Sequence, residues 1–443
     1  MTAETTLARM VGRLAAIAAL GCLTACGFFD EEERLEGTRT PVRQAASAAE
    51  AAGAVIERAL PQARPRDSWS QTGGSPAHSG GHISGPGGLS LAWTADAGTG
   101  SSSDSVVTAA PVVAGGVVYT LDAAAEVSAF DATSGALRWS TSLVPNEDED
   151  GEEGFGGGLA LDGDRLIATT GFGEILALST ATGEVLWRDS FGAPFRAAPA
   201  ANAGRVVAVT RASQVFALES SSGQVLWRSE GVAAEAGWLG GASPAIGGGG
   251  AVVPYASGEL AAFDINTGRR FWGAVISGGR RGLARAAITD LTGDPVLLGP
   301  LVIAANQSGR LAAFQARTGR RIWTRVLGAT RPLWAAGDTL YLVSDAGTLL
   351  RLDASSGQTL WSRQLPIWED EEDLEDPITY SGPVVTSGRV IVSDSIGQIW
   401  SLDAISGEGG VAGEIPSGSI TGPVVAGGTL YLLSSDAVLH AFR

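Results

Sequence analysis

The stretch Ala129-Phe130-Asp131-Ala132-Thr133-Ser134-Gly135-Ala136-Leu137-Arg138-Trp139 decides the fold, because versions of it recur to the end of the chain. Each copy places a glycine and then a tryptophan at intervals of four residues after an aspartate or its substitute. A seventh copy, Leu402 to Gly407, has Val411 where the tryptophan is expected. Successive tryptophans are 38 to 51 residues apart, a period typical of β-propeller blades. The tryptophans of the six complete copies are Trp139, Trp187, Trp227, Trp272, Trp323 and Trp361.

One repeat can be read as four short strands. Ala110–Gly116 predicts an inner strand that ends in a glycine turn, and Val117–Leu121 and Glu126–Phe130 predict the next two. Asp131–Gly135 has the composition of a tight turn, in which the carboxylate bonds turn amides and the glycine adopts a positive φ. The fourth strand carries Trp139, whose ring is expected to fill the wedge between neighbouring blades.

The two ends of the chain supply the last blade. The final segment, Gly422–Arg443, contains only three strand patterns, and the missing fourth is found at Leu89–Trp93. Trp93 lies 46 residues before Trp139, which matches the repeat period. We therefore predict an all-β, eight-bladed propeller over residues 68–443, closed by the N-terminal strand. Closure removes the exposed strand edges, and we expect the propeller to be a monomer.

The N-terminal 25 residues resemble a lipoprotein signal peptide. Arg9 and Arg13 precede a short apolar core, Leu14–Leu20, which is too short to span a bilayer. Leu23-Thr24-Ala25-Cys26 then resembles a lipobox, which would make Cys26 the lipid anchor. The alternative is an ordinary signal peptide cut near Ala25.

Residues 26–67 form an acidic, alanine-rich stretch that we interpret as a tether. Gly27 follows Cys26, and this favours delivery to the outer membrane, with the protein on its periplasmic face. Ala45–Leu60 is expected to form a loose helix that ends at Pro61. The mature chain keeps only Cys26, so no disulfide is expected.

Charge excludes some partners. The chain has 30 arginines and no lysine against 47 acidic residues, a formal net charge of -17. This balance argues against nucleic acid or anionic lipid as the main partner.

No residue pattern predicts catalysis. His78 and His82 lie in a Gly/Ser-rich stretch without a third metal ligand and are expected to be solvated loop residues, and the third histidine, His440, lies in the last strand pattern. Glu369–Asp376 lacks the spaced oxygen ligands of a calcium loop and is interpreted as a solvated acidic loop. We predict no catalytic residue, no metal and no cofactor.

The Asp-x-x-x-Gly-x-x-x-Trp repeat resembles the pyrroloquinoline-quinone (PQQ)-type propeller repeat, which covers about 85% of the chain. Eight copies on a lipoprotein resemble the BamB family of the outer-membrane β-barrel assembly machinery. Leu35–Val42 is similar to the leader of alphaproteobacterial members. The resemblance implies a non-catalytic scaffold that binds the BamA-type subunit.

Two other functions remain open. Periplasmic PQQ-dependent dehydrogenases share the repeat, but they usually carry adjacent cysteines and long insertions that this chain lacks. A propeller lipoprotein of another envelope assembly system, such as cell-wall or polysaccharide assembly, has the same sequence features.

The resemblance implies that the partner binds two loops between blades. The first is Ala236–Leu239, where Leu239 replaces the family's arginine and Trp238 an aliphatic residue. The second is Ile288–Pro295, which keeps Asp290 but has Thr292 in place of a second aspartate. Trp238 and Asp290 have no evident packing role in these connections. The predicted contact residues are Trp238, Leu239, Arg285, Asp290 and Thr292, with Arg280 and Arg281 as further partners for carboxylates.

Overall fold

The computed structural model describes residues 58–145, 154–234, 240–276, 290–307, 309–329, 331–419 and 421–443. The predicted signal peptide, Cys26, most of the tether, and Trp238, Leu239 and Arg285 lie outside these ranges. Within them, no helix is long and apolar enough to cross a membrane.

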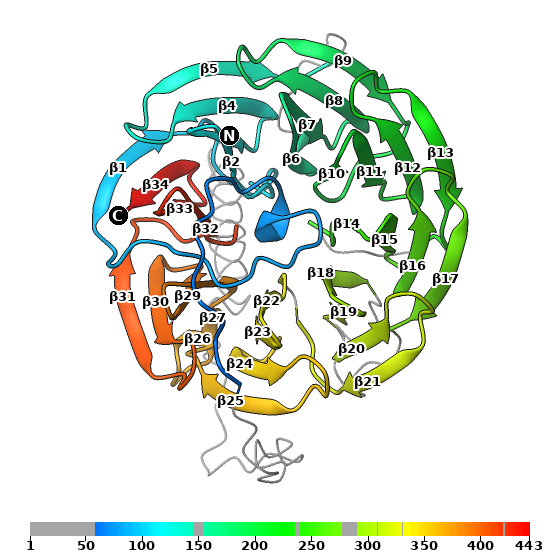
Figure 1. The fold of residues 1–443 in the computed structure, drawn as a ribbon. Coiled ribbons are helices and arrows are strands. Elements are labelled where there is room, and N and C mark those ends of the chain that lie inside the picture. The colour runs from blue at the N-terminus through cyan, green and yellow to red at the C-terminus, as the bar shows by residue number, and fades with distance from the viewer. Residues whose placement is uncertain are drawn as a thin grey trace, which may run out of the picture. The chain divides into compact units, whose positions relative to one another are not determined.

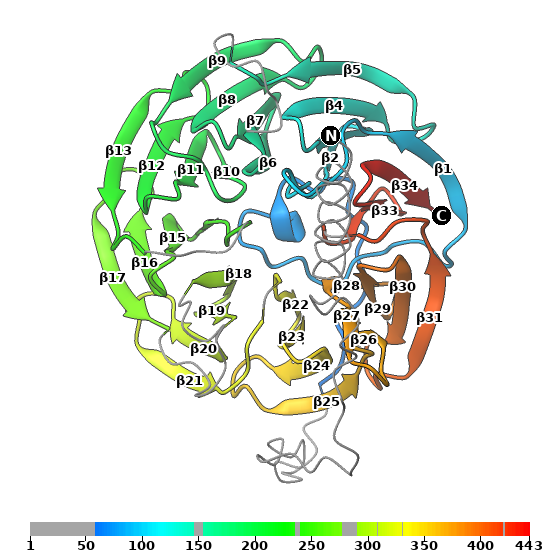
Figure 2. The ribbon, with the colours of Figure 1, turned by 180° about the vertical axis from the view of Figure 1, so that it is seen from behind.

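Eight four-stranded antiparallel sheets surround a central channel, which confirms the predicted eight-bladed propeller (Figures 1 and 2). In blades 1 to 7 the strands run from the channel outward in chain order, and in blade 8 the outermost strand is β1. Blade 1 comprises β2 (Val112–Ala114), β3 (Val117–Leu121), β4 (Glu126–Asp131) and β5 (Leu137–Ser142), and blade 2 comprises β6 (Gly158–Asp162), β7 (Arg165–Thr169), β8 (Glu174–Ser179) and β9 (Val185–Ser190). Blade 3 comprises β10 (Ala200–Asn202), β11 (Arg205–Val209), β12 (Gln214–Glu219) and β13 (Val225–Glu230), and blade 4 comprises β14 (Ala245–Gly247), β15 (Gly250–Pro254), β16 (Glu259–Asp264) and β17 (Arg270–Val275).

The remaining blades follow the same order. Blade 5 comprises β18 (Leu291–Leu298), β19 (Leu301–Asn306), β20 (Arg310–Gln315) and β21 (Arg321–Arg325), and blade 6 comprises β22 (Trp334–Ala336), β23 (Thr339–Val343), β24 (Thr348–Asp353) and β25 (Thr359–Gln364). Blade 7 comprises β28 (Tyr380–Thr386), β29 (Arg389–Asp394), β30 (Gln398–Asp403) and β31 (Gly409–Glu414), and blade 8 comprises β32 (Val424–Ala426), β33 (Thr429–Leu433), β34 (Val438–Phe442) and β1 (Leu91–Asp96). A small hairpin, β26 (Trp368–Asp370) and β27 (Glu375–Pro377), lies between blades 6 and 7.

The predicted closure is confirmed by the pairing of β1 with β34. Trp93 is opposite Ala441, and Asp96 is opposite Val438. Because the strands alternate in direction, the turns after the first and third strands of every blade lie on one face, which we call the turn face. The turns after the second strands and the connections between blades lie on the other, the connection face.

Neighbouring blades are joined by a tryptophan that covers a glycine. Each outer-strand tryptophan lies on the turn glycine of the next blade, where an added Cβ would come within 2.5–2.9 Å of its ring. The glycine is therefore required for the ring to approach this closely. The pairs around the ring are Trp93–Gly135, Trp139–Gly183, Trp187–Gly223, Trp227–Gly268, Trp272–Gly319, Trp323–Gly357 and Trp361–Gly407.

All but one of the same tryptophans donate a hydrogen bond to the next blade. At six of these seven junctions the indole Nε1 donates to a backbone carbonyl three residues before the covered glycine, so its polar atom is satisfied; Trp93 Nε1 makes no such bond among the described residues. The bonds join Trp139 to Thr180 (3.2 Å), Trp187 to Ser220 (2.9 Å), Trp227 to Ile265 (2.9 Å), Trp272 to Ala316 (2.7 Å), Trp323 to Ala354 (3.0 Å) and Trp361 to Ala404 (3.2 Å).

This arrangement explains why the seventh copy has no tryptophan. A tryptophan at position 411 would have to cover the turn between the third and fourth strands of blade 8, but the fourth strand of that blade is β1, which no turn joins to β34. No turn glycine exists there for a ring to cover. Blade 7 instead carries Trp400 on its third strand, opposite Val411, where the indole Nε1 donates to Asp394 Oδ2 of the same blade at 3.0 Å.

Residues 66–84, which we call the belt, run once around the channel and bond to the first strand of every blade (Figure 1, blue). These strands would otherwise present a bare edge to the channel. The belt meets blade 8 first and then blades 1 to 7 in turn. In that order the bonds join Arg66 O to Gly427 N (2.8 Å), Trp69 to Val113 (2.7 and 2.8 Å), Ser70 O to Leu161 N (2.7 Å), Gln71 Oε1 to Ala201 N (3.0 Å), Pro76 O to Ile246 N (2.7 Å), Ala77 O to Leu297 N (2.9 Å), Gly81 N to Ala335 O (2.9 Å) and Ile83 N to Val385 O (3.1 Å).

The belt fills the channel near the turn face. Trp69 stacks on Trp334 of β22 with ring centroids 5.4 Å apart, and Trp334 Nε1 donates to Gly81 O at 2.8 Å. A short 3-10 helix, η1 (Thr72–Gly74), stands in the middle of the ring. The sequence analysis did not anticipate this closure of the channel.

Two glycine substitutions in blade 5 distinguish the stability lost through the tryptophan contact from the stability lost through backbone strain. Gly319 and Gly299 both have positive φ (68° and 55°), but only a Cβ at Gly319 meets a ring, that of Trp272. We expect Gly299→Ala to cost about 1–2 kcal/mol of unfolding free energy from backbone strain. Gly319→Ala should cost about 1–3 kcal/mol more, because the ring must move. Urea unfolding of both variants measures the difference, and equal losses would contradict the proposed role of the contact.

Candidate functional site at the channel mouth

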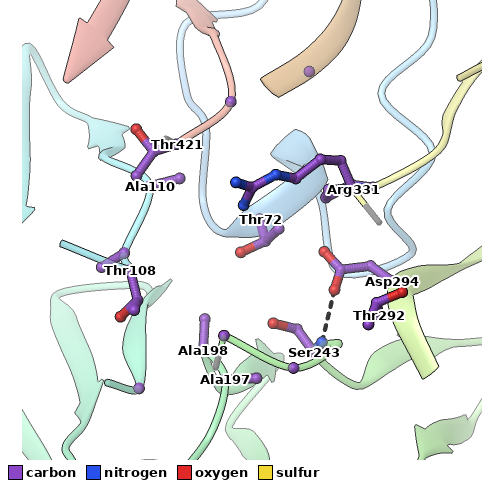
Figure 3. A pocket seen from close by; sticks show the side chains of 17 residues that line it. Thr72, Thr108, Ala110, Ala197, Ala198, Ser243, Thr292, Asp294, Arg331 and Thr421 are labelled. Carbon is purple, nitrogen blue, oxygen red and sulfur yellow. Dashed lines mark hydrogen bonds between the residues drawn. The ribbon is translucent and has the colours of Figure 1, made fainter. Parts of the chain in front are cut away.

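A pocket of about 90 Å³ lies in the channel, and the belt residue Thr72 is part of its lining (Figure 3). Its walls come from the chain just before or within the first strands of the blades. Small residues line most of it, including Ala110, Ala198, Gly382 and Gly422. This follows from the repeat, which places a small residue and often a proline at this point. The pocket therefore lies at the connection face, where the connections between blades end.

Arg331 is the exception among these small residues. It precedes Pro332 in blade 6, and its side chain extends into the pocket (Figure 3). In the described part of the chain its guanidinium makes no hydrogen bond or ion pair. Burial lowers the pKa of Arg331 from its usual value, but an arginine remains charged under all ordinary conditions. The pocket thus holds a cation that an incoming carboxylate or phosphate can bind.

A second charged group, Asp294 of β18, lies on the same wall. Its Oδ1 accepts from the backbone amide of Ser243 at 2.7 Å, and its buried Oδ2 has no hydrogen bond among the described residues. Burial raises the pKa of Asp294, and nearby His78 and Arg196 oppose this.

His78 lies against the same strand, with only 1% of its surface exposed. Its Nδ1 is 3.0 Å from Pro295 O, so this nitrogen carries the proton and the ring is held as the Nδ1–H tautomer. Burial lowers the pKa of His78, against the attraction of Asp294. The prediction of solvated histidines is therefore wrong for His78. His440 lies in β34, as its strand pattern predicts, and is buried there, and His82 links Pro61 O to Gly388 N.

A buried ion pair joins three blades beside the pocket. Arg196, just before β10 of blade 3, binds Asp290 with both guanidinium ends, Nη2 to Oδ1 at 2.6 Å and Nη1 to Oδ2 at 3.0 Å. Nη2 also donates to Leu291 O at 3.1 Å. Gly241, at the entry to blade 4, lies against the guanidinium, where a Cβ would come within 2.1 Å of Arg196 Nε.

The structure corrects the expectation that Asp290 lacks a packing role. Its side chain is fully buried because it is the counter-charge of Arg196. Thr292 is also buried, and its Oγ1 donates to Ala329 O at 2.9 Å in the approach to blade 6. Both residues lie beside the pocket, so the structure brings them together. Trp238, Leu239 and Arg285 lie outside the described residues.

Sequence reasoning missed Arg196 and Arg331. Arg331 has a detectable signal, because Arg331-Pro332 stands where other repeats have a small residue before proline, as in Ala198-Pro199. Arg196 has none, since it lies 94 residues from Asp290 and meets it only once the ring is closed.

The acidic segment Glu369–Asp376 forms most of the exposed hairpin β26–β27. In the ranges that the structure describes, no group of three His, Cys, Asp or Glu side chains is placed to hold a metal ion.

The pocket does not fit a tricyclic quinone cofactor. Sites for ligands of that size have volumes of roughly 300–1,000 Å³, several times the 90 Å³ found here. The belt also occupies the channel behind it, where Trp69 stacks on Trp334.

The buried ion pair can be tested with a double-mutant cycle. Arg196→Leu or Asp290→Leu alone leaves a buried charge without its partner, and we expect each to cost about 3–5 kcal/mol of unfolding free energy. The double variant should cost clearly less than the sum, because no unpaired charge remains. Denaturant unfolding of the four proteins measures the coupling. Strictly additive losses would show that the two side chains do not stabilise each other.

With the geometry established, the chain can be compared with known proteins. A family model described as outer membrane protein assembly factor BamB matches residues 86–150 and 123–363. BamB of Salmonella typhimurium is 32% identical over 334 residues, which cover 75% of this chain and 83% of that protein.

Solved structures show the same fold. The crystal structure of BamB from Moraxella catarrhalis aligns with a TM-score of 0.63 and 21% identity, covering 80% of this chain and 97% of that one. Quinohemoprotein alcohol dehydrogenase from Comamonas testosteroni aligns with a TM-score of 0.63 and 14% identity, covering 85% and 80%, so it shares the fold alone. On the family model and the sequence identity over three quarters of its length, the chain belongs to the BamB family of outer membrane protein assembly factors.

Proposed function

We propose that this protein is a non-catalytic scaffold of the outer-membrane β-barrel assembly machinery. It is anchored by acylated Cys26 to the periplasmic side of the outer membrane and binds the BamA-type subunit. Membership of the BamB family supports the assembly role. A rigid ring closed at both its outer strands and its channel supports a scaffold, since its loops are presented in fixed places.

The buried pair Arg196–Asp290 carries the proposal for the binding site. It ties the end of the blade 4–5 connection, at Asp290 and Leu291, to the end of the blade 3–4 connection, at Gly241. A backbone bond from Ala242 N to Leu291 O, 3.3 Å long, reinforces this link. The described ends of the two connections that the family resemblance selects therefore lie beside each other on the connection face.

The structure suggests a division of roles among the five predicted residues. Asp290 and Thr292 are buried and position the two connections. We assign the direct contacts to Trp238, Leu239 and Arg285. A tryptophan and an arginine are the residue types that most often concentrate binding energy in an interface. Arg331, recessed in the pocket between these connections and blade 6, offers a further site for a partner carboxylate.

Trp238→Ala tests the proposed interface. We expect a loss of affinity for the BamA-type subunit of about 10- to 100-fold, because a central aromatic contact is removed. Trp368→Ala is the matched control, since Trp368 also lies in a connection between blades but on the far side of the ring. Co-purification with the subunit measures binding, and circular dichroism checks the fold. Full binding by a folded Trp238→Ala protein would place the site elsewhere.

Cys26→Ala tests the anchor. Three acyl chains give stable membrane attachment, whereas none leaves the protein with no hydrophobic anchor. We expect the variant to leave the outer-membrane fraction, and mass spectrometry of the parent to find acylation at Cys26. Unchanged fractionation of the variant would refute the anchor and leave the interface test unaffected.

A further inference from the structure

The charge of the chain is strongly segregated along the sequence. Residues 269–331 contain eleven arginines and only two acidic residues, Asp290 and Asp294, a formal charge of +9 within a chain of -17. Both of these aspartates are buried. The surface contributed by this segment is therefore basic, although the protein as a whole is acidic.

Five of these arginines form what we call the arginine patch: Arg269, Arg270, Arg317, Arg320 and Arg321. All five are exposed. Arg269, Arg317 and Arg320 lie on the turn face, in the turns before the outer strands β17 of blade 4 and β21 of blade 5, and Arg270 and Arg321 are the first residues of these strands. Only these two repeats have two arginines directly after the turn glycine. The corresponding residue pairs elsewhere are Ala136-Leu137, Glu184-Val185, Gln224-Val225, Gln358-Thr359 and Glu408-Gly409.

The two turns adjoin each other on the rim (Figure 1, β17 and β21). Trp272 Nε1 of blade 4 donates to Ala316 O in the turn of blade 5 at 2.7 Å. Arg321 Nη2 of blade 5 reaches back to Val275 O of blade 4 at 2.9 Å. The arginines of both blades therefore form one surface.

The patch is only partly neutralised. Arg270 pairs with Glu259, and Arg269 lies over the Phe271 ring at 5.3 Å. The side chains of Arg317 and Arg320 make no hydrogen bond or ion pair in the described ranges. Their guanidinium groups are available to an external anion, and their planar donors match phosphate oxygens.

Apolar side chains lie among the arginines. Phe271 is 45% exposed and Ile322 42% exposed, each immediately before the blade tryptophan. Between blades 4 and 5 a groove of about 530 Å³ is lined by Phe271, Leu297 and Arg317. Arginines beside exposed aromatic and aliphatic groups suit an interface that has charged headgroups above an apolar layer.

The N-terminal chain reaches the propeller next to this patch. Arg58, the first described residue, binds Asp353 of the blade 6 turn, with Nε 2.5 Å from Oδ2. Arg325 of blade 5 joins the same turn through a 2.7 Å bond from Nη1 to Gly357 O. Arg58 thus lies at the turn face, one blade from the arginine patch.

We propose that the arginine patch docks on anionic phospholipid headgroups and sets the orientation of the propeller. The proposal rests on the proposed function, in which acylated Cys26 holds the chain near a bilayer. The arginine patch then orients the propeller so that its turn face is directed toward the bilayer. The connection face, with the pocket and the partner loops, then points away from the membrane. The acidic remainder of the protein does not prevent this, because charges farther apart than about 8 Å are largely screened at physiological ionic strength.

The test uses the full acylated protein reconstituted in vesicles of phosphatidylcholine, with or without phosphatidylglycerol. A bimane label on Ile322→Cys reports contact with a nitroxide lipid that quenches near the headgroups. Leu186→Cys, the equivalent position on blade 2 and 48% exposed, is the control reporter. Either cysteine is unique for labelling, since Cys26 is acylated and Cys22 precedes it in the signal peptide. Flotation with phosphatidylcholine vesicles checks the anchor separately.

We expect quenching of the Ile322→Cys label only with phosphatidylglycerol, and none at Leu186→Cys. Each arginine near an anionic surface strengthens docking by about fivefold, so Arg317→Gln with Arg320→Gln should lower the ratio of docked to undocked protein by about 25-fold. Arg228→Gln with Arg363→Gln removes the same charge from exposed sites outside the patch and should have no effect.

Four results would overturn the proposal. Equal quenching in both lipids, or quenching that the Arg317/Arg320 variant retains, would show that the patch does not recognise anionic headgroups. Loss of docking in inorganic phosphate at matched ionic strength would assign the patch to free phosphate. Displacement from the vesicles by a polyglutamate peptide that binds with the same arginine dependence would assign it to an acidic protein.

Discussion

The contact on which the whole ring depends is a tryptophan ring lying on a glycine of the next blade. Blades are four-stranded wedges whose outer ends diverge, and a large flat side chain is needed to fill the gap between them. The glycine lets the ring approach to van der Waals contact with the turn backbone, and at six of the seven junctions the indole Nε1 donates to the same turn. The sequence repeat follows from this geometry, since the glycine of one blade serves the tryptophan of the previous one. Val411 departs from the repeat for the same reason, because the next blade takes β1 as its fourth strand and has no turn between its third and fourth strands.

The inner ends of the blades are held by a different constraint. The first strand of each blade has one edge facing the channel, and eight such edges surround a space too narrow for a ninth sheet. The belt satisfies them with one or two hydrogen bonds per blade and fills the axis with Trp69 on Trp334. The channel is consequently reduced to a small pocket near the connection face, and Asp294, Arg331 and the pair Arg196–Asp290 surround it. These charged side chains therefore gather in the part of the channel that the belt does not fill.

The sequence predicts the propeller well because its decisive contacts lie at fixed offsets within a repeat. The blade count and the closure by Leu89–Trp93 could be read from Trp93 and the three last strands. The belt could not, since it bonds each blade only once or twice and has no strand period. Asp290 was predicted to be exposed because its partner, Arg196, is two blades away and meets it only in the closed ring. For the same reason, His78 gave no sign of its burial against Pro295.

Net charge was the least informative of the sequence quantities. A value of -17 averages an acidic majority with the basic segment 269–331, and it suggested repulsion from every anionic surface. A surface, however, is recognised over distances comparable to the screening length, so the local distribution of charge decides which anions can approach. In a propeller, residues close in sequence lie in the same or adjacent blades, and a basic segment therefore becomes a basic sector of the rim. Because turns and connections alternate between the two faces, one ring can present cations to one neighbour on its turn face while its connections bind another.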